Sequence, residues 1–229
     1  MESEALQERK TVLRTGEREV RLSPVKRENY TALSDKQIAA KRVLDFVITL
    51  CAVPILLPLS LIIAVLIKLD SRGSLLFTQQ RIGKSGEVFV LYKFRSMKID
   101  AEKNGSKFAS EGDNRITKLG NFIRTYRIDE IPQFWNVLKG EMSVIGPRPE
   151  QASFVEFFNE EIEHYTLRHA IKPGITGLAQ VSQGYTSCKR TTKFKLDYDL
   201  FYIRNYSFQL DLNIVYKTIK TILTGFGSR

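Results

Sequence analysis

The longest feature of the hydrophobic pattern is an uncharged run over residues 46–67, in which Thr49 and Ser60 are the polar side chains. A run of this length is typical of a helix embedded in a membrane. It starts too far along the chain, and is too long, for the apolar core of a cleavable signal peptide. The pattern therefore predicts a membrane element over residues 41–69.

Two topologies are open for this element. Pro54 and Pro58 lie near its middle, where proline removes backbone donors and bends a helix. Basic residues, which mark the cytoplasmic side of a membrane, flank the run on both sides: Lys36, Lys41, Arg42, Lys68, Arg72, Arg81 and Lys84. Both features favour a re-entrant helix, broken at the prolines, with both ends in the cytoplasm. The alternative is a single kinked span, because transmembrane helices tolerate proline.

The remaining pattern is that of an α+β domain, mostly helical. Alternating apolar residues predict a β-hairpin with strands over 75–82 and 88–94 and a turn at 83–86. Helical spacing predicts helices over residues 119–125, 131–138, 154–167, 194–204 and 211–223. Turn residues dominate 100–116 and 172–184. We therefore divide the chain into a polar N-terminal arm (1–40), the membrane element (41–69) and a cytoplasmic domain (70–229).

The last predicted helix has one apolar face, formed by Leu212, Val215, Ile219 and Ile222. Lys217 and Lys220 lie on another face. We interpret the apolar face as part of the domain core. Contact with a membrane interface is the alternative.

Composition narrows the classes of protein further. The 229 residues are 43% hydrophobic, which suits a folded domain and excludes a disordered or fibrous chain. Two cysteines and two histidines exclude a disulfide framework and argue against a zinc enzyme, and we interpret His164 and His169 as structural. The net charge of +10 predicts an anionic partner, which could be nucleic acid, a membrane surface or a phosphorylated substrate.

Two adjacent carboxylates, Asp129 and Glu130, precede Ile131 and Pro132. Proline is favoured in the first turn of a helix, so the pair is placed at a helix N-terminus. The dipole there stabilises a carboxylate as an anion, the form required of a nucleophile or a magnesium ligand. Simple capping of the helix is the alternative.

Arginines surround this pair in the sequence. Arg124 and Arg127 lie upstream, and Arg148 lies downstream between two prolines in the segment 146–149. One guanidinium group can donate two parallel hydrogen bonds to phosphate oxygens. The flanking prolines stiffen the backbone that presents Arg148. These residue types suit phosphoryl transfer, whereas ordinary ion pairs and a structural turn are the alternative.

Two further groups are candidates for binding. Lys93 and Arg95 are two residues apart on the second predicted strand, so they share a face and repel unless an anion lies between them. A solvated sheet face is the alternative. Gln180 follows a glycine-rich turn, for which a purely structural role is the default. The sequence contains neither a P-loop nor a dinucleotide-binding glycine motif.

Taken together, several ordered motifs resemble a known family. They are KRVLDF, LLFTQQRIG, YKFRSM, RIDEIPQFWNVLKGEMSVIGPRPE, KPGITGLAQV and KLDYDLFYIRNYSFQLDLNI, and they extend from Lys41 to about Leu223. The chain resembles the catalytic domain of bacterial sugar transferases, the monotopic polyprenyl-phosphate phosphoglycosyl transferases.

The resemblance implies transfer of a sugar phosphate from a UDP-sugar to polyprenyl phosphate at the cytoplasmic face of the bacterial inner membrane. UMP leaves, and a glycan such as an exopolysaccharide, O-antigen or capsule is started. It implies Mg²⁺ and a covalent intermediate on Asp129, with Glu130 completing the pair and Asp129 also named as the metal ligand. By the same resemblance Lys93, Arg124, Arg148 and Gln180 belong to the phosphate site.

The sequence also departs from the family pattern. Leu57 precedes Pro58 where the family has serine, and Leu178 stands where many members have tryptophan. We expect Leu57 to affect the geometry of the bend in the membrane helix. We expect Leu178 to affect a surface or substrate contact. The other class of function that we considered is a membrane-tethered basic module that binds nucleic acid or anionic lipid. The arginines gather around one acidic pair rather than along a stripe, so the enzyme is favoured and nucleic acid is not an expected partner.

Overall fold

The computed structural model describes residues 11–15, 18–22, 33–99, 101, 113–183 and 189–225. Most of the predicted polar arm and of the predicted loop over 100–116 lies outside these residues, as does Cys188. Within the arm, strands β1 (Thr11–Thr15) and β2 (Arg18–Leu22) pair antiparallel, a hairpin that the sequence pattern did not predict.

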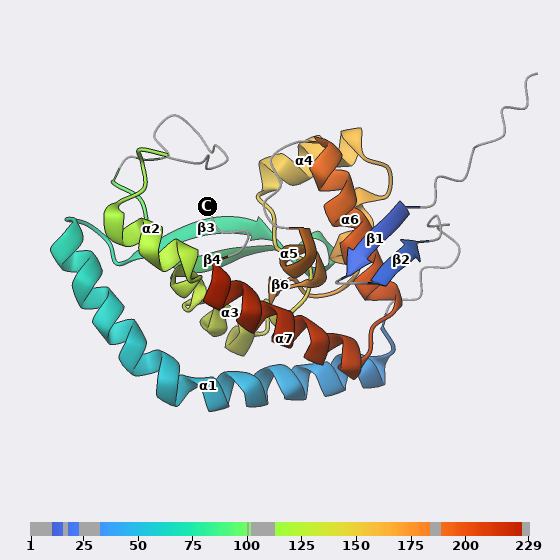
Figure 1. The fold of residues 1–229 in the computed structure, drawn as a ribbon, viewed down its shortest axis with the longest axis horizontal. Helices are drawn as coiled ribbons and strands as arrows, with labels where there is room; N and C mark the ends of the chain where they lie inside the picture. Colours follow the sequence, from blue (N-terminus) through green and yellow to red (C-terminus); the bar gives the residue numbers. More distant parts are fainter. Residues whose placement is uncertain are drawn as a thin grey trace, which may run out of the picture.

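The predicted membrane element is a single helix, α1 (Asp35–Asp70), which begins six residues earlier than predicted. Ser34 and Gln37 form a capping box at its N-terminus. The expected break is not present, because the backbone stays helical through Pro54 and Pro58. Figure 1 shows instead that α1 changes direction near its middle. The two prolines thus accompany a bend within one helix.

The first part of α1 is fastened to the domain by three polar side chains. Lys41 Nζ lies 2.9 Å from Asp211 Oδ2, and Asp45 Oδ1 accepts hydrogen bonds from the Ser143 hydroxyl and the Val144 N–H, both at 2.9 Å. Arg42 donates to the carbonyls of residues 137 and 138. Lys41 and Arg42, two of the basic residues that flank the apolar run, therefore form contacts within the domain. Their charge is weaker evidence for a cytoplasmic position of this end of the helix.

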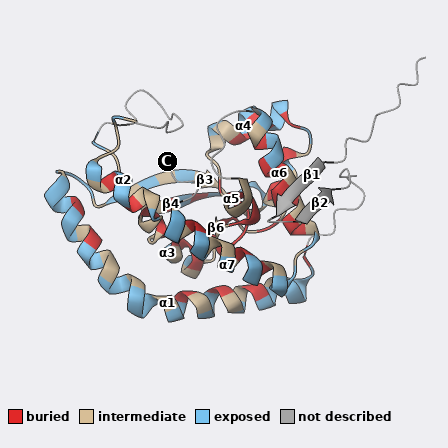
Figure 2. Ribbon diagram, viewed as in Figure 1, coloured by how far each residue is buried: buried red, intermediate tan, exposed pale blue. Residues whose placement is uncertain are grey.

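The second part of α1 carries many exposed apolar residues, and Figure 2 colours much of this helix as exposed. Among the described residues, α1 is the helix with the length and composition to cross a membrane. The most exposed apolar side chains of α1 are Val43, Leu50, Ile55, Leu57, Leu61, Ile62, Val65 and Leu69.

The predicted β-hairpin is confirmed. Strands β3 (Leu76–Ile82) and β4 (Val88–Phe94) pair antiparallel in full register, and a 3₁₀ turn, η2 (Lys84–Gly86), joins them. Both Ser85 and Gly86 have positive φ in this turn.

A second pairing was not predicted. Strands β5 (Ser143–Ile145) and β6 (Gly174–Thr176) are parallel and join segments about thirty residues apart. A Cβ at Gly174 would lie 2.0 Å from the Gly146 nitrogen, so only glycine permits this close approach. The turn-rich segment over 172–184 consequently contains a strand and a short helix.

Helices form much of the rest of the described chain, and Figure 1 shows them around the sheets β3–β4 and β5–β6. They are α2 (Lys118–Thr125), η3 (Ile128–Glu130), α3 (Gln133–Lys139), α4 (Ala152–Glu161), η4 (Tyr165–Ala170), α5 (Leu178–Gln183), α6 (Lys189–Arg204) and α7 (Phe208–Thr224). The single helix predicted over 154–167 is wrong: α4 ends because Ile162 is extended and His164 has a φ of 63°.

The apolar face predicted for the last helix is also wrong in part. Leu212 and Ile219 are more than half exposed, whereas Asp211, Ile214 and Thr221 form the buried face of α7. The exposed face carries a stripe at helical spacing, made of Phe208, Leu212, Tyr216, Ile219 and Leu223. The interpretation of this apolar face as domain core therefore holds for Val215, which packs against the core, and is wrong for Leu212 and Ile219.

Candidate active site

Asp129 and Glu130 lie in the 3₁₀ turn η3, between α2 and α3. Arg127 starts this turn with a φ of 54°, a left-handed conformation that is costly for a residue with a side chain. Ile131 and Pro132 then adopt right-handed helical angles and lead into α3. Both carboxylates are buried, with relative exposures of 7% for Asp129 and 5% for Glu130.

Strand β4 brings Lys93 to the carboxylate pair. Lys93 Nζ lies 3.5 Å from Asp129 Oδ2 and 3.3 Å from Glu130 Oε1. The strand is held against α3 by Asn136, whose amide donates to the Val90 carbonyl at 2.7 Å and accepts from the Tyr92 N–H at 3.2 Å. The position of Lys93 is thus set by hydrogen bonds on the strand immediately before it.

Arg148 reaches the pair from the loop that follows β5. Its Nη2 lies 2.8 Å from Glu130 Oε1. Backbone hydrogen bonds fix this loop: the Gly146 N–H donates to the Thr176 carbonyl at 2.8 Å, and the Gly174 N–H donates to the Pro147 carbonyl at 2.9 Å. The glycine-rich segment after Lys172 therefore supports the backbone that presents Arg148.

The surroundings of the two carboxylates shift their pKa values in opposite directions. Burial raises the pKa of Asp129; Lys93 opposes the shift, while the neighbouring Glu130 adds to it. Burial also acts to raise the pKa of Glu130, but Arg148, Lys93 and Arg127 outweigh it and hold that pKa well below its usual value. Glu130 is thus a fixed anion that anchors cations, and Asp129 is the more basic and less engaged carboxylate.

Two of the predicted binding residues have other contacts. Arg95 lies just beyond the end of β4 and donates to the Ser71 and Arg72 carbonyls at 2.7 and 2.8 Å, so it fastens the C-terminus of α1. Gln180 donates to the Ile175 carbonyl at 3.0 Å, within the segment that supports the Arg148 loop. Lys93 contacts the carboxylate pair and Arg95 contacts the end of α1, so the two do not share one anion as predicted.

Arg124 lies at the end of α2, and its charge opposes the rise in the pKa of Asp129. Arg127 Nη1 is 3.9 Å from Glu130 Oε2. The structure thus brings Lys93, Arg127 and Arg148 to the pair, with Arg124 near enough to act on Asp129. That these cations form a phosphate site stays a prediction.

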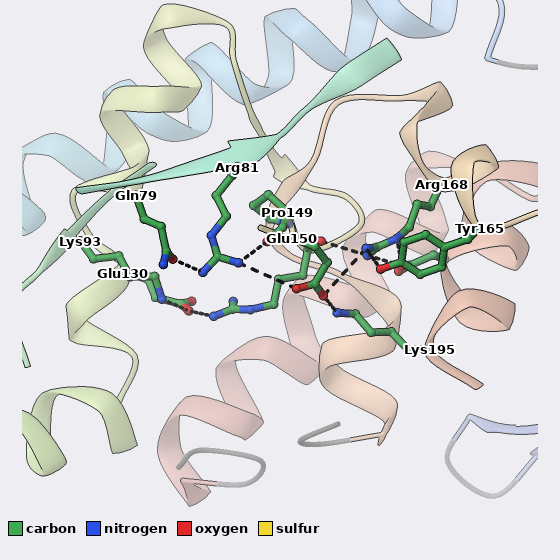
Figure 3. A network of polar contacts seen from close by, with 11 residues as sticks. Gln79, Arg81, Lys93, Glu130, Pro149, Glu150, Tyr165, Arg168 and Lys195 are labelled. Atoms are coloured by element: carbon green, nitrogen blue, oxygen red, sulfur yellow. Dashed lines mark hydrogen bonds and ion pairs between the residues drawn. The ribbon is translucent and has the colours of Figure 1, made fainter. Parts of the chain in front are cut away.

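A second buried ionic cluster adjoins the site, and Figure 3 shows the connection between the two. Arg168 donates to the Arg148 carbonyl at 2.9 Å and pairs with Asp199 at 2.7 Å. Glu150 contacts Lys195, and lies 3.8 Å from both Arg168 and Arg81. Sequence reasoning missed this cluster because its members are far apart in the chain, although Glu150 directly follows the Gly-Pro-Arg-Pro segment.

The carboxylates suit one mode of magnesium binding. No group of three histidine, cysteine, aspartate or glutamate side chains among the described residues could hold a metal ion. Mg²⁺ is often held by one or two carboxylates together with substrate phosphates and water. Asp129, whose contact with Lys93 is long at 3.5 Å, fits that mode better than Glu130, which Arg148 already engages at 2.8 Å.

Comparison with known proteins places this fold and site in a family. The sequence model of bacterial sugar transferases matches residues 36–225, which is most of the chain. The chain belongs to the bacterial sugar transferase family. The match includes α1, the hairpin that carries Lys93, the carboxylate pair and the Arg148 loop.

Relatives give the family resemblance its detail. The chain is 52% identical over 189 residues to the UDP-N-acetylgalactosamine-undecaprenyl-phosphate N-acetylgalactosaminephosphotransferase of Aeromonas hydrophila, covering 82% of this chain and 45% of the relative. It is 41% identical over 181 residues to the UDP-glucose:undecaprenyl-phosphate glucose-1-phosphate transferase of Klebsiella pneumoniae, covering 78% of this chain and 39% of the relative.

A third relative is matched almost end to end. The exopolysaccharide production protein PSS of Rhizobium leguminosarum bv. phaseoli is 38% identical over 193 residues, covering 82% of this chain and 96% of the relative. The chain therefore spans less than half the length of the first two relatives but nearly the whole of the third.

Proposed function

We propose that this protein transfers a sugar 1-phosphate from a UDP-sugar to undecaprenyl phosphate and releases UMP. The observation that carries the proposal is the buried Asp129–Glu130 pair beneath Lys93 and Arg148, in a chain whose relatives carry names for this type of reaction. A buried anion pair lined by cations suits phosphoryl transfer, which depends on positioning and charge neutralisation more than on acid–base chemistry.

Asp129 is the proposed nucleophile. Its carboxylate oxygen attacks the phosphorus that bears the sugar, and the bond from that phosphorus to the oxygen of UMP breaks, with UMP taking the electron pair. The phosphate of undecaprenyl phosphate then attacks the same phosphorus, and the Asp129 carboxylate leaves. A covalent intermediate allows two bulky substrates to use one site in turn. The raised pKa of Asp129 supports this role, because a more basic carboxylate is a better nucleophile once ionised.

Glu130 and its cations have a supporting role in this proposal. Because Glu130 holds Arg148 and Lys93, it fixes two donors beside Asp129. Arg148 and Lys93 are then placed to bind the oxygens of the donor diphosphate. Bound Mg²⁺ would be held by Asp129 and the diphosphate, and it would neutralise the charge that develops on the leaving phosphate.

Membrane association is the third part of the proposal. The exposed apolar side chains of α1 and the exposed stripe of α7 would be costly in water, and they suit a protein that rests in one leaflet. We propose that α1 enters the cytoplasmic leaflet, turns at its bend and returns. A lipid phosphate and a soluble nucleotide sugar would then meet at the cytoplasmic surface of the bacterial inner membrane.

The proposal is tested by release of UMP. Purified protein in nanodiscs receives Mg²⁺, undecaprenyl phosphate and, separately, UDP-N-acetylgalactosamine, UDP-N-acetylglucosamine, UDP-glucose and UDP-galactose. We expect UMP release that requires both the lipid phosphate and one of these donors. Arg148→Ala should lower the rate about 100-fold or more, because it removes a charge-assisted contact to the reacting phosphates.

An exposed arginine provides the matched control. Arg190→Ala near the start of α6, remote from the carboxylate pair in the sequence, should leave the rate within about twofold of the wild type. If no donor supports UMP release above the rate without protein, the proposed activity is wrong.

A further inference from the structure

A buried glutamine at the base of the site has no hydrogen-bond partner. Gln133 is the first residue of α3, and it is 1% exposed. Its Nε2 has no partner among the residues that the structure describes. An unpaired buried amide is costly, and native proteins rarely keep one. Gln133 therefore needs an explanation beyond packing.

Gln133 lies between Glu130 and Asn136, two residues that contact strand β4. One turn later, Asn136 is hydrogen-bonded to strand β4 at Val90 and Tyr92. One turn earlier, Glu130 contacts Lys93, the next residue of the same strand. Gln133 thus lies on the face of α3 that packs against β4, between the residue that positions the strand and the carboxylate that contacts its lysine.

Local geometry places Gln133 one turn after the carboxylate pair. The backbone continues from the 3₁₀ turn η3 through Ile131 and Pro132, both at right-handed helical angles, into α3. In a 3₁₀ turn residues three apart align, so Gln133 follows Glu130 on one face and Asp129 lies on the adjoining face. Glutamine–aspartate pairs four residues apart form hydrogen bonds across one turn of an α-helix. Helical side chains also lean toward the N-terminus, which is the direction of Asp129.

The contact between Asp129 and Lys93 is long, at 3.5 Å. Lys93 is also one of the cations proposed to bind the donor phosphates, so on the proposed function donor binding draws it away from Asp129. We propose that Gln133 is a positioning residue that donates its free Nε2–H to the Asp129 carboxylate once Lys93 engages the phosphates. The hydrogen bond then keeps the attacking oxygen in line with the phosphorus. This inference rests on the proposed function.

Replacement of Gln133 by methionine separates this role from a structural one. Gln133→Met keeps the volume and removes the unpaired amide, so Tm should rise by about 2–4 °C. The kcat for UMP release should fall about tenfold or more, with the donor KM within about twofold. If Gln133 served only the fold, Gln133→Met would lower Tm instead of raising it.

Gln180 provides the comparison for stability. It is also buried, and its Oε1 has no partner among the described residues, but its Nε2 donates to the Ile175 carbonyl. Gln180→Met removes that donor, so Tm should rise less than in Gln133→Met or should fall. Gln209, on the exposed face of α7, is the control for activity, and Gln209→Met should change neither Tm nor kcat.

Each other outcome overturns the inference. A lower Tm for Gln133→Met would mean that the amide holds the fold, for instance through a bound water. A higher Tm with unchanged kcat would mean that the amide is dispensable, and a raised KM with unchanged kcat would assign it to donor binding. Failure of the proposed function is distinguishable from all of these, because the wild-type protein would then release no UMP.

Discussion

Asp129 and Glu130 are adjacent in the chain, yet their surroundings give them different chemical characters. Glu130 is held by Arg148, Lys93 and Arg127, whereas Asp129 has one long contact with Lys93. Their pKa values consequently shift in opposite directions, upward for Asp129 and downward for Glu130. Groups whose environments separate their pKa values in this way commonly have different roles in one site.

The same residue-scale reasoning predicts how Glu150 affects acid stability. Burial acts to raise its pKa, but Lys195, Arg168 and Arg81 outweigh it and hold the pKa at about 2, below the usual 4.5. The stabilisation is therefore complete above about pH 4.5 and is lost as the pH falls toward 2. A shift of this size corresponds to about 3 kcal/mol of stability at neutral pH.

Glu150→Gln should remove this dependence. The variant should have a lower free energy of unfolding at pH 7, and a shallower decline of that free energy between about pH 5 and 2 than the wild type. Urea unfolding in detergent across this pH range measures both. Glu160→Gln, on the exposed face of α4, is the control and should retain the wild-type slope. Equal slopes for Glu150→Gln and wild type would contradict the assignment.

At the scale of elements, the structure shows why short motifs far apart in the chain belong to one site. The Arg148 loop is held by β6 on one side and by Arg168 on the other. Strand β4 is held by Asn136, and α1 is held by Lys41, Arg42 and Asp45. The first part of α1 is therefore a structural member of the domain, and its second part is the apolar extension.

The buried pair between α1 and α7 predicts a large loss of stability when it is broken. Lys41 and Asp211 are 9% and 2% exposed at their side chains, and Tyr202 also donates to Asp211. Lys41→Met should lower the free energy of unfolding by about 3–5 kcal/mol, because it leaves a buried carboxylate without its cation.

A double substitution isolates the interaction. Lys41→Met with Asp211→Asn should be less destabilised than the sum of the two single variants, as measured by urea unfolding. Lys36→Met, on the exposed first turn of α1, should change stability by less than about 0.5 kcal/mol. Strict additivity of the two single effects would show that the pair does not couple the helices.

Elements with clear periodicity were predictable, and contacts between distant elements were not. The hairpin of β3 and β4 and the helix over 118–125 follow from spacing and turn residues. The helix predicted over 194–204 is α6, which begins five residues earlier, at Lys189. Strands β5 and β6 have three residues each, too few for a period to be seen. Gly174 gave a turn signal there, although its actual role is to admit the backbone of Gly146.

In the candidate site, features marked by neighbouring residues were predictable, and contacts across the chain were not. Pro132 placed Asp129 and Glu130 at the start of a helical turn, and the prolines around Arg148 marked a stiff loop. Arg95 was misplaced because the strand ends one residue before it, so alternation no longer determines its face. Lys41 was read as a membrane flank because its partner, Asp211, is 170 residues away.

At the scale of the whole molecule, the proposed membrane association depends on the bent helix α1. Its apolar second part is exposed, and Arg95 fastens its C-terminal end to the hairpin. Both ends of α1 are thus attached to the same domain, by Lys41 at one end and Arg95 at the other. This arrangement favours a helix that enters and leaves one side of the membrane over one that spans it.

Labelling of the two ends tests this topology. Lys36→Cys and Arg72→Cys, each in a background with Cys51 and Cys188 replaced by serine, place single thiols at the exposed ends of α1. A membrane-impermeant maleimide should label both in inside-out vesicles and neither in intact right-side-out vesicles. Labelling of the two positions from opposite sides would show that α1 spans the membrane.

The central claim is that Asp129 carries the sugar phosphate, and intact-mass measurement tests it most directly. Protein incubated with Mg²⁺ and its UDP-sugar, without lipid acceptor, should gain the mass of one phosphosugar and release one UMP. Added undecaprenyl phosphate should return the protein to its original mass. Asp129→Asn should fold with unchanged Tm within about 2 °C and show no gain. An adduct of the same mass on Asp129→Asn, or UMP release by that variant at the wild-type rate, would contradict the account.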